Sequence, residues 1–350
     1  KGRDDKYLET INPLIESGHM QATIDGEYKY PHRINLFVGV SCMFKCFFCG
    51  RNYSAHYKKT PQVYETYKQI IDQDDGTDPY RLNISGGQEP LTNPYINQIC
   101  KDLYDGGYKS RLLTNFFMAN PEWLSKNEWI NSLDHIRVSL YGLDEDEMIA
   151  TTKHSKSYKT VKSNLRYYNQ RQERTNLYLN YVLHPSNYTK LSKLIRFIED
   201  IGGIEHLSLR EDFAFNHEIM ERNKLQDYLC RFDERANEIG LKVDYGYSLH
   251  QLINGYDTRL IRADLKHLTA KQSPQIKIAV DPKGDIYYYY EAAFLDRLGA
   301  ERHILGNVVG SSIENELKKM KTIEPQESDI QYMDAFNHVI EVYKWNMLHS

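Results

Sequence analysis

The chain has 350 residues, of which 41% are hydrophobic and 26% are charged, and its formal net charge is −4. This composition is typical of a folded globular protein, so extensive disorder is excluded, and the slight acidic excess argues against a nucleic-acid partner. No apolar run is long enough to cross a bilayer and no signal peptide is visible, so we expect a cytoplasmic protein without a membrane partner.

Six segments rich in β-branched and aromatic residues each lead into a turn or a polar sequence. They predict strands at 34–40, 81–85, 111–115, 135–140, 176–183 and 204–210. Helical periodicity fills the gaps, most clearly at 188–200, where apolar residues recur at i, i+3, i+4 and i+7 from Leu191. Alternating strands and helices predict an α/β fold with a parallel sheet, and six units favour a partial (β/α)6 TIM-type barrel. In such a barrel, functional residues collect at the carboxyl ends of the strands.

The pattern changes after residue 215. A long helical stretch to Gly240 precedes a possible strand at 241–245, and the segments 276–280 and 286–290 predict a hairpin. The expected organisation is an N-terminal segment (1–30), a barrel domain (31–215) and a small α+β C-terminal extension (216–350). We expect this extension to cover the mouth of the barrel.

Three of the five cysteines, Cys42, Cys46 and Cys49, form a CxxxCxxC pattern in the loop after the first predicted strand. Thiolates bind iron–sulfur clusters, zinc or copper. A four-iron cluster normally takes four cysteines, so three leave one iron open for an exchangeable ligand. A structural zinc ion needs a closed set of four ligands, which only His56 is near enough to complete. The pattern favours the cluster and leaves zinc as the alternative.

With this motif directly after the first strand, residues 30–215 resemble the radical S-adenosylmethionine (SAM) superfamily. The resemblance implies an enzyme whose 4Fe–4S cluster chelates SAM at the open iron and takes its electron from a donor such as flavodoxin or ferredoxin. It also implies that SAM is cleaved to a 5′-deoxyadenosyl radical, which takes a hydrogen atom from the substrate. Phe48, before the third cysteine, then packs on the adenine.

The segment 83–91, with the sequence NISGGQEPL, resembles the glycine-rich GGEP segment of that superfamily. Gly86 and Gly87 allow a close backbone approach to SAM, and Glu89 accepts hydrogen bonds from its ammonium group. Gln88 departs from the family pattern because it separates the glycines from the glutamate. By the same resemblance, later strand ends supply further SAM ligands, although capping of strand ends explains these residues equally well. These ligands are Ser139, Asn180 and Arg210.

The predicted hairpin, with the segment 305–308, resembles a SPASM or twitch extension that has lost its cysteines and therefore its auxiliary cluster. Without that cluster the product radical has no internal electron acceptor, which favours redox-neutral elimination, decarboxylation, epimerisation or carbon–carbon bond formation. The candidate substrate residues are Thr114, Asn115, Tyr290 and Glu291. Cys230, or alternatively Cys100, is a candidate hydrogen donor, although each is also a plausible core residue.

The preferred function is radical chemistry on a small-molecule substrate such as a sugar, an aminosugar or a nucleoside-like intermediate of natural-product biosynthesis. Maturation of a peptide (a RiPP precursor) is the first alternative. It is disfavoured because only about 33 residues precede the first strand, too few for a separate leader-binding domain. The second alternative is a non-enzymatic zinc-binding protein. RNA modification is disfavoured by the acidic charge balance.

Overall fold

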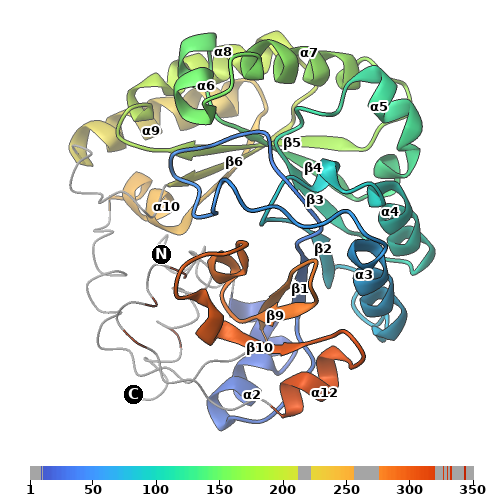
Figure 1. Ribbon diagram of the computed structural model, residues 1–350. Helices are drawn as coiled ribbons and strands as arrows, with labels where there is room; N and C mark the ends of the chain where they lie inside the picture. Colours follow the sequence, from blue (N-terminus) through green and yellow to red (C-terminus); the bar gives the residue numbers. More distant parts are fainter. Residues whose placement is uncertain are drawn as a thin grey trace.

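The computed structural model describes residues 11–211, 222–255 and 276–319, together with the single positions Glu9, Gln326, Asp329, Tyr332 and Tyr343. Within these residues, ten strands form one sheet in the order β10-β9-β8-β1-β2-β3-β4-β5-β6-β7 (Figure 1). The strands are β1 (Arg33–Leu36), β2 (Leu82–Ile84), β3 (Arg111–Thr114), β4 (His135–Leu140), β5 (Asn176–Leu183), β6 (His206–Glu211), β7 (Lys242–Tyr245), β8 (Lys277–Val280), β9 (Asp285–Tyr287) and β10 (Ile304–Asn307).

Every pairing from β8 to β7 is parallel, whereas β9 and β10 continue the sheet in the antiparallel sense. The sheet is open, because β10 and β7 form its two edges. The six predicted strands correspond to β1–β6, so the predicted parallel α/β architecture is confirmed. The predicted hairpin is β8–β9. The predicted domain boundary near residue 215 lies outside the described residues, and β7 and β8 extend the same sheet beyond β6 and β1.

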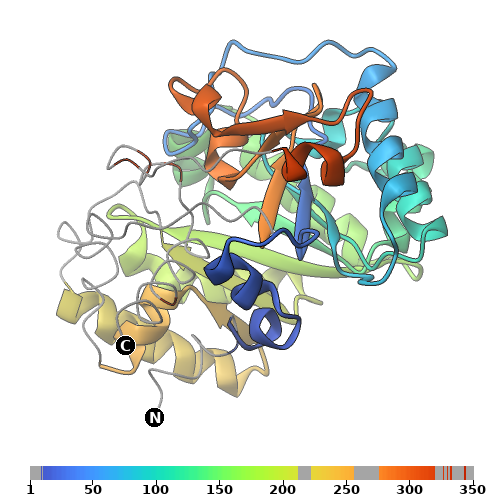
Figure 2. The same ribbon diagram turned by 90° about the horizontal axis from the view of Figure 1, so that it is seen from below.

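The helices that follow the strands in sequence cover one face of this sheet and form an arc around it in Figure 1. Figure 2 shows β9, β10 and α12 at the end of the sheet where β1 and β8 end, and α2 at the end where β1 begins.

No helix in the described part of the chain is long and apolar enough to cross a bilayer. The helices are α2 (His19–Asp25), α3 (Gln62–Gln73), α4 (Ile96–Asp105), α5 (Pro121–Lys126), α6 (Glu145–Thr152), α7 (Ser157–Asn169), α8 (Leu191–Ile201), α9 (Arg222–Glu238), α10 (Tyr247–Ile253) and α12 (Ile313–Lys318), with short 3-10 segments η1 (Pro90–Thr92), η2 (Glu128–Ser132), η3 (Tyr188–Lys190), η5 (Tyr290–Ala293) and η6 (Ala300–His303).

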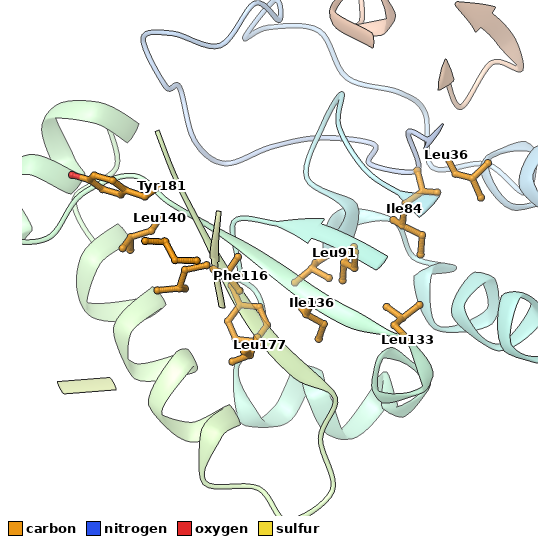
Figure 3. Packing of buried hydrophobic residues seen from close by; sticks show 14 of the residues in the cluster. Leu36, Ile84, Leu91, Phe116, Leu133, Ile136, Leu140, Leu177 and Tyr181 are labelled. Atoms are coloured by element: carbon orange, nitrogen blue, oxygen red, sulfur yellow. The ribbon is translucent and has the colours of Figure 1, made fainter. Parts of the chain in front are cut away.

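The hydrophobic core lies between the sheet and these helices (Figure 3). Successive side chains of a strand point to opposite faces, so each strand contributes every second residue to the core. On β4 the core residues are Ile136, Val138 and Leu140, all of them buried. The alternate residues of the same strand, His135, Arg137 and Ser139, therefore lie on the inner face, which points away from the helices. An apolar outer face and a polar inner face follow from this alternation.

Candidate active site

The three cysteines of the loop after β1 lie close together. Cys46 is buried, and Cys42 and Cys49 are half-buried. Burial raises the pKa of all three thiols, to about 12 for Cys42, and the proximity of Cys49 and Cys42 raises the pKa of Cys46 further. A site that enforces such proximity favours a ligand that stabilises sulfur as thiolate, as iron does.

Arg51 supplies a positive charge beside these thiols. Its guanidinium is buried and donates hydrogen bonds to the carbonyl oxygens of Phe44 and Cys42, both in the cysteine loop. Its charge lowers the pKa of each of the three thiols, against the larger effect of burial. Within the described residues its Nη1 atom is buried without a hydrogen-bond partner. The sequence reasoning missed Arg51, whose only signal is an arginine two positions after the last cysteine.

The number and type of the donors fit an iron–sulfur cluster, because three thiolates leave one iron open for another ligand. Nowhere in the described ranges do three His, Cys, Asp or Glu side chains form a group that could hold one metal ion. His56, the predicted fourth ligand of the zinc alternative, is exposed. In a four-iron cluster each cysteine binds a different iron, so the thiols surround a small volume and do not converge on one point. Three thiolates beside a buried arginine fit that group.

The glycine-rich turn follows β2 and has room only for glycine. Gly86 and Gly87 have φ of 52° and 69°, which favour glycine. A Cβ atom on Gly86 would overlap the ring of Phe37 and lie 2.5 Å from the hydroxyl of Tyr290, and one on Gly87 would lie 2.8 Å from Phe37. The turn is joined to the cysteine loop, because the Glu89 N–H donates to the carbonyl of Ser41 at 2.9 Å.

Glu89 is a buried carboxylate that fastens the ends of β2 and β3 to each other. It accepts hydrogen bonds from the Leu91 N–H at 3.1 Å, from the Asn115 N–H at 2.7 Å and from the Thr114 hydroxyl. Burial raises its pKa to about 7 although these bonds oppose the shift. The predicted contact between Glu89 and the ammonium group of SAM stays a prediction.

Gln88, which departs from the family pattern, holds a neighbouring loop in place. Its Nε2 donates to the carbonyl oxygen of Ala55 at 2.8 Å. Its Oε1 is buried, and no hydrogen-bond partner for it is found among the residues described. The extra residue therefore ties the turn to the segment that follows the cysteines.

The two candidate substrate residues at the end of β3 contact the loops that carry the cofactor motifs. Thr114 is buried, where it donates to Glu89 and accepts from the Phe116 N–H at 2.9 Å. Asn115 donates from Nδ2 to the sulfur atoms of Met43 at 3.3 Å and Cys42 at 3.7 Å. Asn115 thus contacts a cysteine of the motif directly, while a role for either residue in substrate binding stays a prediction.

The later predicted SAM ligands lie on the inner face of the sheet. Ser139, Asn180 and Ser208 are in register across β4, β5 and β6. Arg210, two residues beyond Ser208, forms an ion pair with Asp244 of β7 and donates to its carbonyl oxygen at 2.9 Å. The structure therefore brings Ser139 and Asn180 together, whereas it gives Arg210 an acidic partner from the chain itself.

Phe48 lies among aromatic side chains above these strand ends. Its ring centroid is 5.9 Å from that of Tyr141 and 6.4 Å from that of His184. A half-buried aromatic ring in such surroundings can stack on a flat base. Packing of Phe48 on the adenine of SAM stays a prediction.

The segment 290–297, in the C-terminal part of the chain, lies against both the glycine-rich turn and the cysteine loop. The hydroxyls of Tyr290 and Ser85 are 2.6 Å apart, and the rings of Tyr290 and Phe37 meet edge-on at 4.6 Å. Glu291 forms an ion pair with Arg297 at 3.0 Å, and the Arg297 side chain packs on Gly50. Tyr290 and Glu291 are thus placed beside the predicted cofactor residues, and their contact with substrate stays a prediction.

The two remaining cysteines lie in or on the helical layer. Cys100 of α4 is buried in the hydrophobic core. Cys230 of α9 is half-buried, and burial together with Asp227, Asp233 and Glu234 raises its pKa. Nothing in these surroundings assigns either thiol as a hydrogen donor, which stays a prediction for Cys230.

Comparison with known proteins adds findings on family and fold. The sequence profile of the Radical SAM superfamily matches residues 36–198. The chain is 31% identical over 359 aligned residues to dTDP-4-amino-4,6-dideoxy-D-glucose ammonia-lyase of Streptomyces venezuelae, covering 95% of this chain and 74% of that protein.

Solved structures are similar in fold. Streptococcus suis SuiB bound to precursor peptide SuiA has a TM-score of 0.59 at 12% identity, covering 95% of this chain and 74% of that one. A histidine-tagged form of anSMEcpe with bound AdoMet has a TM-score of 0.59 at 13% identity, covering 87% of this chain and 84% of that one. At these identities the two structures establish a common fold and nothing about the substrate.

Proposed function

Because the chain belongs to the radical SAM superfamily, and is therefore an enzyme that uses a 4Fe–4S cluster and SAM, we propose that it eliminates ammonia from a nucleotide-linked aminosugar. The observation that carries this proposal is the 31% identity, over 95% of the chain, to a nucleotide-aminosugar ammonia-lyase. The alternative of a non-enzymatic zinc-binding protein is wrong, because membership of this superfamily makes the chain an enzyme.

The proposed reaction converts an amino alcohol to a ketone and ammonia. The carbon that bears the hydroxyl loses a hydrogen, the C–N bond of its neighbour breaks, and that neighbour gains a hydrogen, so the atoms and electrons balance without an oxidant. When bound, the cluster and SAM supply the 5′-deoxyadenosyl radical that begins this exchange by taking the hydrogen atom. The reaction needs no auxiliary cluster, which agrees with the cysteine count.

In this proposal the chain's own residues bind and orient the reactants. Cys42, Cys46 and Cys49 hold the cluster, and the turn at Gly86 and Gly87 presents its backbone to SAM. Phe48 packs on the adenine, and Ser139 and Asn180 bind polar groups of SAM. The segment containing Tyr290 and Glu291 keeps water from the reacting carbons, because it lies over the glycine-rich turn.

Peptide maturation remains the competing proposal, but no observation in this chain favours it. The likeness to SuiB and anSMEcpe lies in the fold, at 12% and 13% identity. The polar, arginine-bearing inner face of the sheet suits a small charged substrate better than an extended peptide. A cytoplasmic location and a flavodoxin or ferredoxin electron donor also stay proposals.

The test is anaerobic reconstitution with iron and sulfide, followed by incubation with SAM, a reductant and dTDP-4-amino-4,6-dideoxy-D-glucose. Ammonium, 5′-deoxyadenosine and the ketosugar are measured. We expect ammonium and ketosugar in equal amounts, and neither from the matched sugar that carries a hydroxyl in place of the amino group. Formation of 5′-deoxyadenosine with a precursor peptide, and no ammonium from any aminosugar, would contradict the proposal.

A further inference from the structure

The inner face of the sheet carries a cluster of arginine and histidine side chains below the predicted SAM ligands. Arg137 of β4 is in register with Tyr178 of β5, which is in register with His206 of β6. The ring of Tyr178 stacks between two imidazoles, at 4.3 Å from His135 and 4.4 Å from His206. Arg111 of β3 is in register with His135. Strands β3, β4 and β6 thus bring two arginines and two histidines onto one face, and β5 places Tyr178 between the histidines.

Among the described residues, Arg111 and Arg137 have no partner of opposite charge. Neither guanidinium makes a hydrogen bond or an ion pair with any residue that the structure describes. Asp244, whose charge acts on both, is already paired with Arg210. Burial lowers the pKa of both arginines, to about 10 for Arg137, and the charge of Arg111 lowers the pKa of Arg137 further. Two like charges held together in protein surroundings need an anion to offset them.

Hydrogen-bonding atoms around the two arginines are also unused. The Nε of Arg137, the Nε2 atoms of His135 and His206, and the hydroxyl of Ser208 are buried without a partner in the described part of the chain. Buried polar atoms of this kind are normally satisfied by a protein group or a bound ligand. Arg111 is exposed, so a ligand can reach these side chains from solvent.

We propose that Arg111 and Arg137 bind the diphosphate group of the nucleotide-linked substrate, a proposal that rests on the proposed function. A guanidinium presents its N–H donors in a planar fork that matches phosphate oxygens. The Ser208 hydroxyl supplies a further donor. His135, whose Nδ1 lies 2.8 Å from the Asp134 carboxylate, and His206 donate from Nε2 when that nitrogen carries a proton. The diphosphate offsets the two unpaired charges and satisfies the buried donors, which no acid of the described chain does.

The position of this cluster fits the rest of the substrate. Ser139 lies two residues beyond Arg137 on the same face, which is about 7 Å along an extended strand. Asn115, which contacts Cys42, lies four residues beyond Arg111, or about 13 Å. A diphosphate at the arginines therefore directs the sugar toward the cysteine loop, where the hydrogen atom is taken.

The experiment compares the binding of three probes to the reconstituted enzyme by calorimetry. The probes are dTDP, thymidine and SAM. SAM is included because its carboxylate is the other anion that could bind Arg111 and Arg137. The variants are Arg111→Met, Arg137→Met and Arg137→Lys. Arg166→Met is the matched control, because Arg166 lies on the helical layer and pairs with Asp200 at 2.6 Å.

We expect each methionine variant to weaken dTDP binding at least tenfold and to leave the affinities for thymidine and SAM within twofold. Arg137→Lys keeps part of the affinity, because it keeps the charge and loses the fork. Arg166→Met binds all three probes as the wild type does. Unchanged dTDP binding in both methionine variants overturns the proposal. A loss of affinity for SAM without a loss of affinity for dTDP also overturns it.

Thermal unfolding without ligand provides the second measurement. Removing an unpaired cation stabilises a folded protein, so we expect both methionine variants to unfold at the same or a higher temperature. A clear fall in both would mean that the arginines hold the fold together, which contradicts a ligand-binding role. If dTDP binding depends on the arginines but no aminosugar releases ammonium, the diphosphate site stands and the proposed elimination is wrong. If ammonium is released and dTDP binding ignores the arginines, only the present inference is wrong.

Discussion

The hydroxyl of Tyr290 lies 2.6 Å from the hydroxyl of Ser85, across 205 positions of sequence. This contact holds the C-terminal segment against the glycine-rich turn, where Tyr290 also packs edge-on against Phe37. The segment that contains Tyr290 and the predicted SAM-binding turn are therefore in direct contact, so a substitution at Tyr290 or Ser85 affects the packing of both.

Replacing Tyr290 by Phe removes this hydrogen bond and keeps the ring. We expect a loss of about 1 kcal/mol in the free energy of unfolding and a severalfold rise in KM for SAM, because the turn loses one of its supports. Denaturant unfolding and 5′-deoxyadenosine kinetics measure the two effects. Tyr104→Phe is the control, since Tyr104 is exposed on α4. Identical kinetics in wild type and Tyr290→Phe would show that the contact does not support the turn.

Cys46→Ala removes one of three cluster ligands. We expect iron to fall from about four per chain toward background, with loss of 5′-deoxyadenosine formation, because two thiolates cannot retain the cluster. The matched control is Cys100→Ala, which also removes a buried thiol but lies in the core, away from the loop. Iron analysis and a product assay are carried out on both proteins. Full iron and activity in Cys46→Ala would refute the assignment of the cluster.

Gly86→Ala places a methyl group against the ring of Phe37 and forces alanine to a φ of 52°. We expect SAM affinity to fall more than tenfold and stability to fall by about 1–3 kcal/mol. Gly76→Ala separates the two causes, because Gly76 has a similar φ of 65° and no atom within 4 Å of the added group. It should lose about 1 kcal/mol and bind SAM normally.

The crowding at Gly86 can be tested further by a second substitution. Gly86→Ala combined with Phe37→Leu gives the methyl group space, so we expect part of the SAM affinity to return. Calorimetric titration of SAM into the single and double variants measures this. If the double variant binds no better than Gly86→Ala, crowding against Phe37 is not the cause, and backbone strain and the contact with the Tyr290 hydroxyl explain the loss.

We expect the buried carboxyl group of Asp281 to make the free energy of unfolding depend on pH. Its carboxylate is buried in the turn after β8, where it accepts hydrogen bonds from the Tyr57 hydroxyl at 3.0 Å and from the Lys283 and Asp285 N–H groups. Burial and the charge of Asp285 raise its pKa to about 7. The folded pKa exceeds the unfolded one, so the neutral carboxyl stabilises the fold at low pH and this stability is lost as pH rises from about 4 through about 7.

Asp281→Asn keeps a neutral acceptor for the two backbone N–H groups. We expect the variant to gain up to about 4 kcal/mol over wild type at pH 8 and to match it near pH 4, since one pKa unit corresponds to about 1.4 kcal/mol. Urea unfolding at both pH values is the measurement, with Asp105→Asn on the surface of α4 as the control. A difference that does not change between the two pH values would contradict the shifted pKa.

Local patterns in the sequence were enough to predict the strands, the helices and the cofactor motifs. The spacing of Cys42, Cys46 and Cys49 and the glycines before Glu89 are contiguous, so their proximity follows from a few bonds of backbone. The six predicted strands appear because alternation and turn residues are also local signals. The predicted hairpin at 276–290 rests on the same kind of signal.

What lies around those motifs depends on strand register and on contacts between distant segments. Arg210 stays a predicted SAM ligand, and only the pairing of β6 with β7 shows that Asp244 lies beside it. Glu89 meets Thr114 and Asn115 because β2 and β3 end side by side. Arg111 and Arg137 come from different strands, and nothing in either segment shows that both lack an acid.

The cofactors could therefore be inferred from the order of residues alone, because their ligands are neighbours along the backbone. Which charges are left without a partner emerged only from the fold, because the pairing of a charge depends on residues that are far apart in the chain.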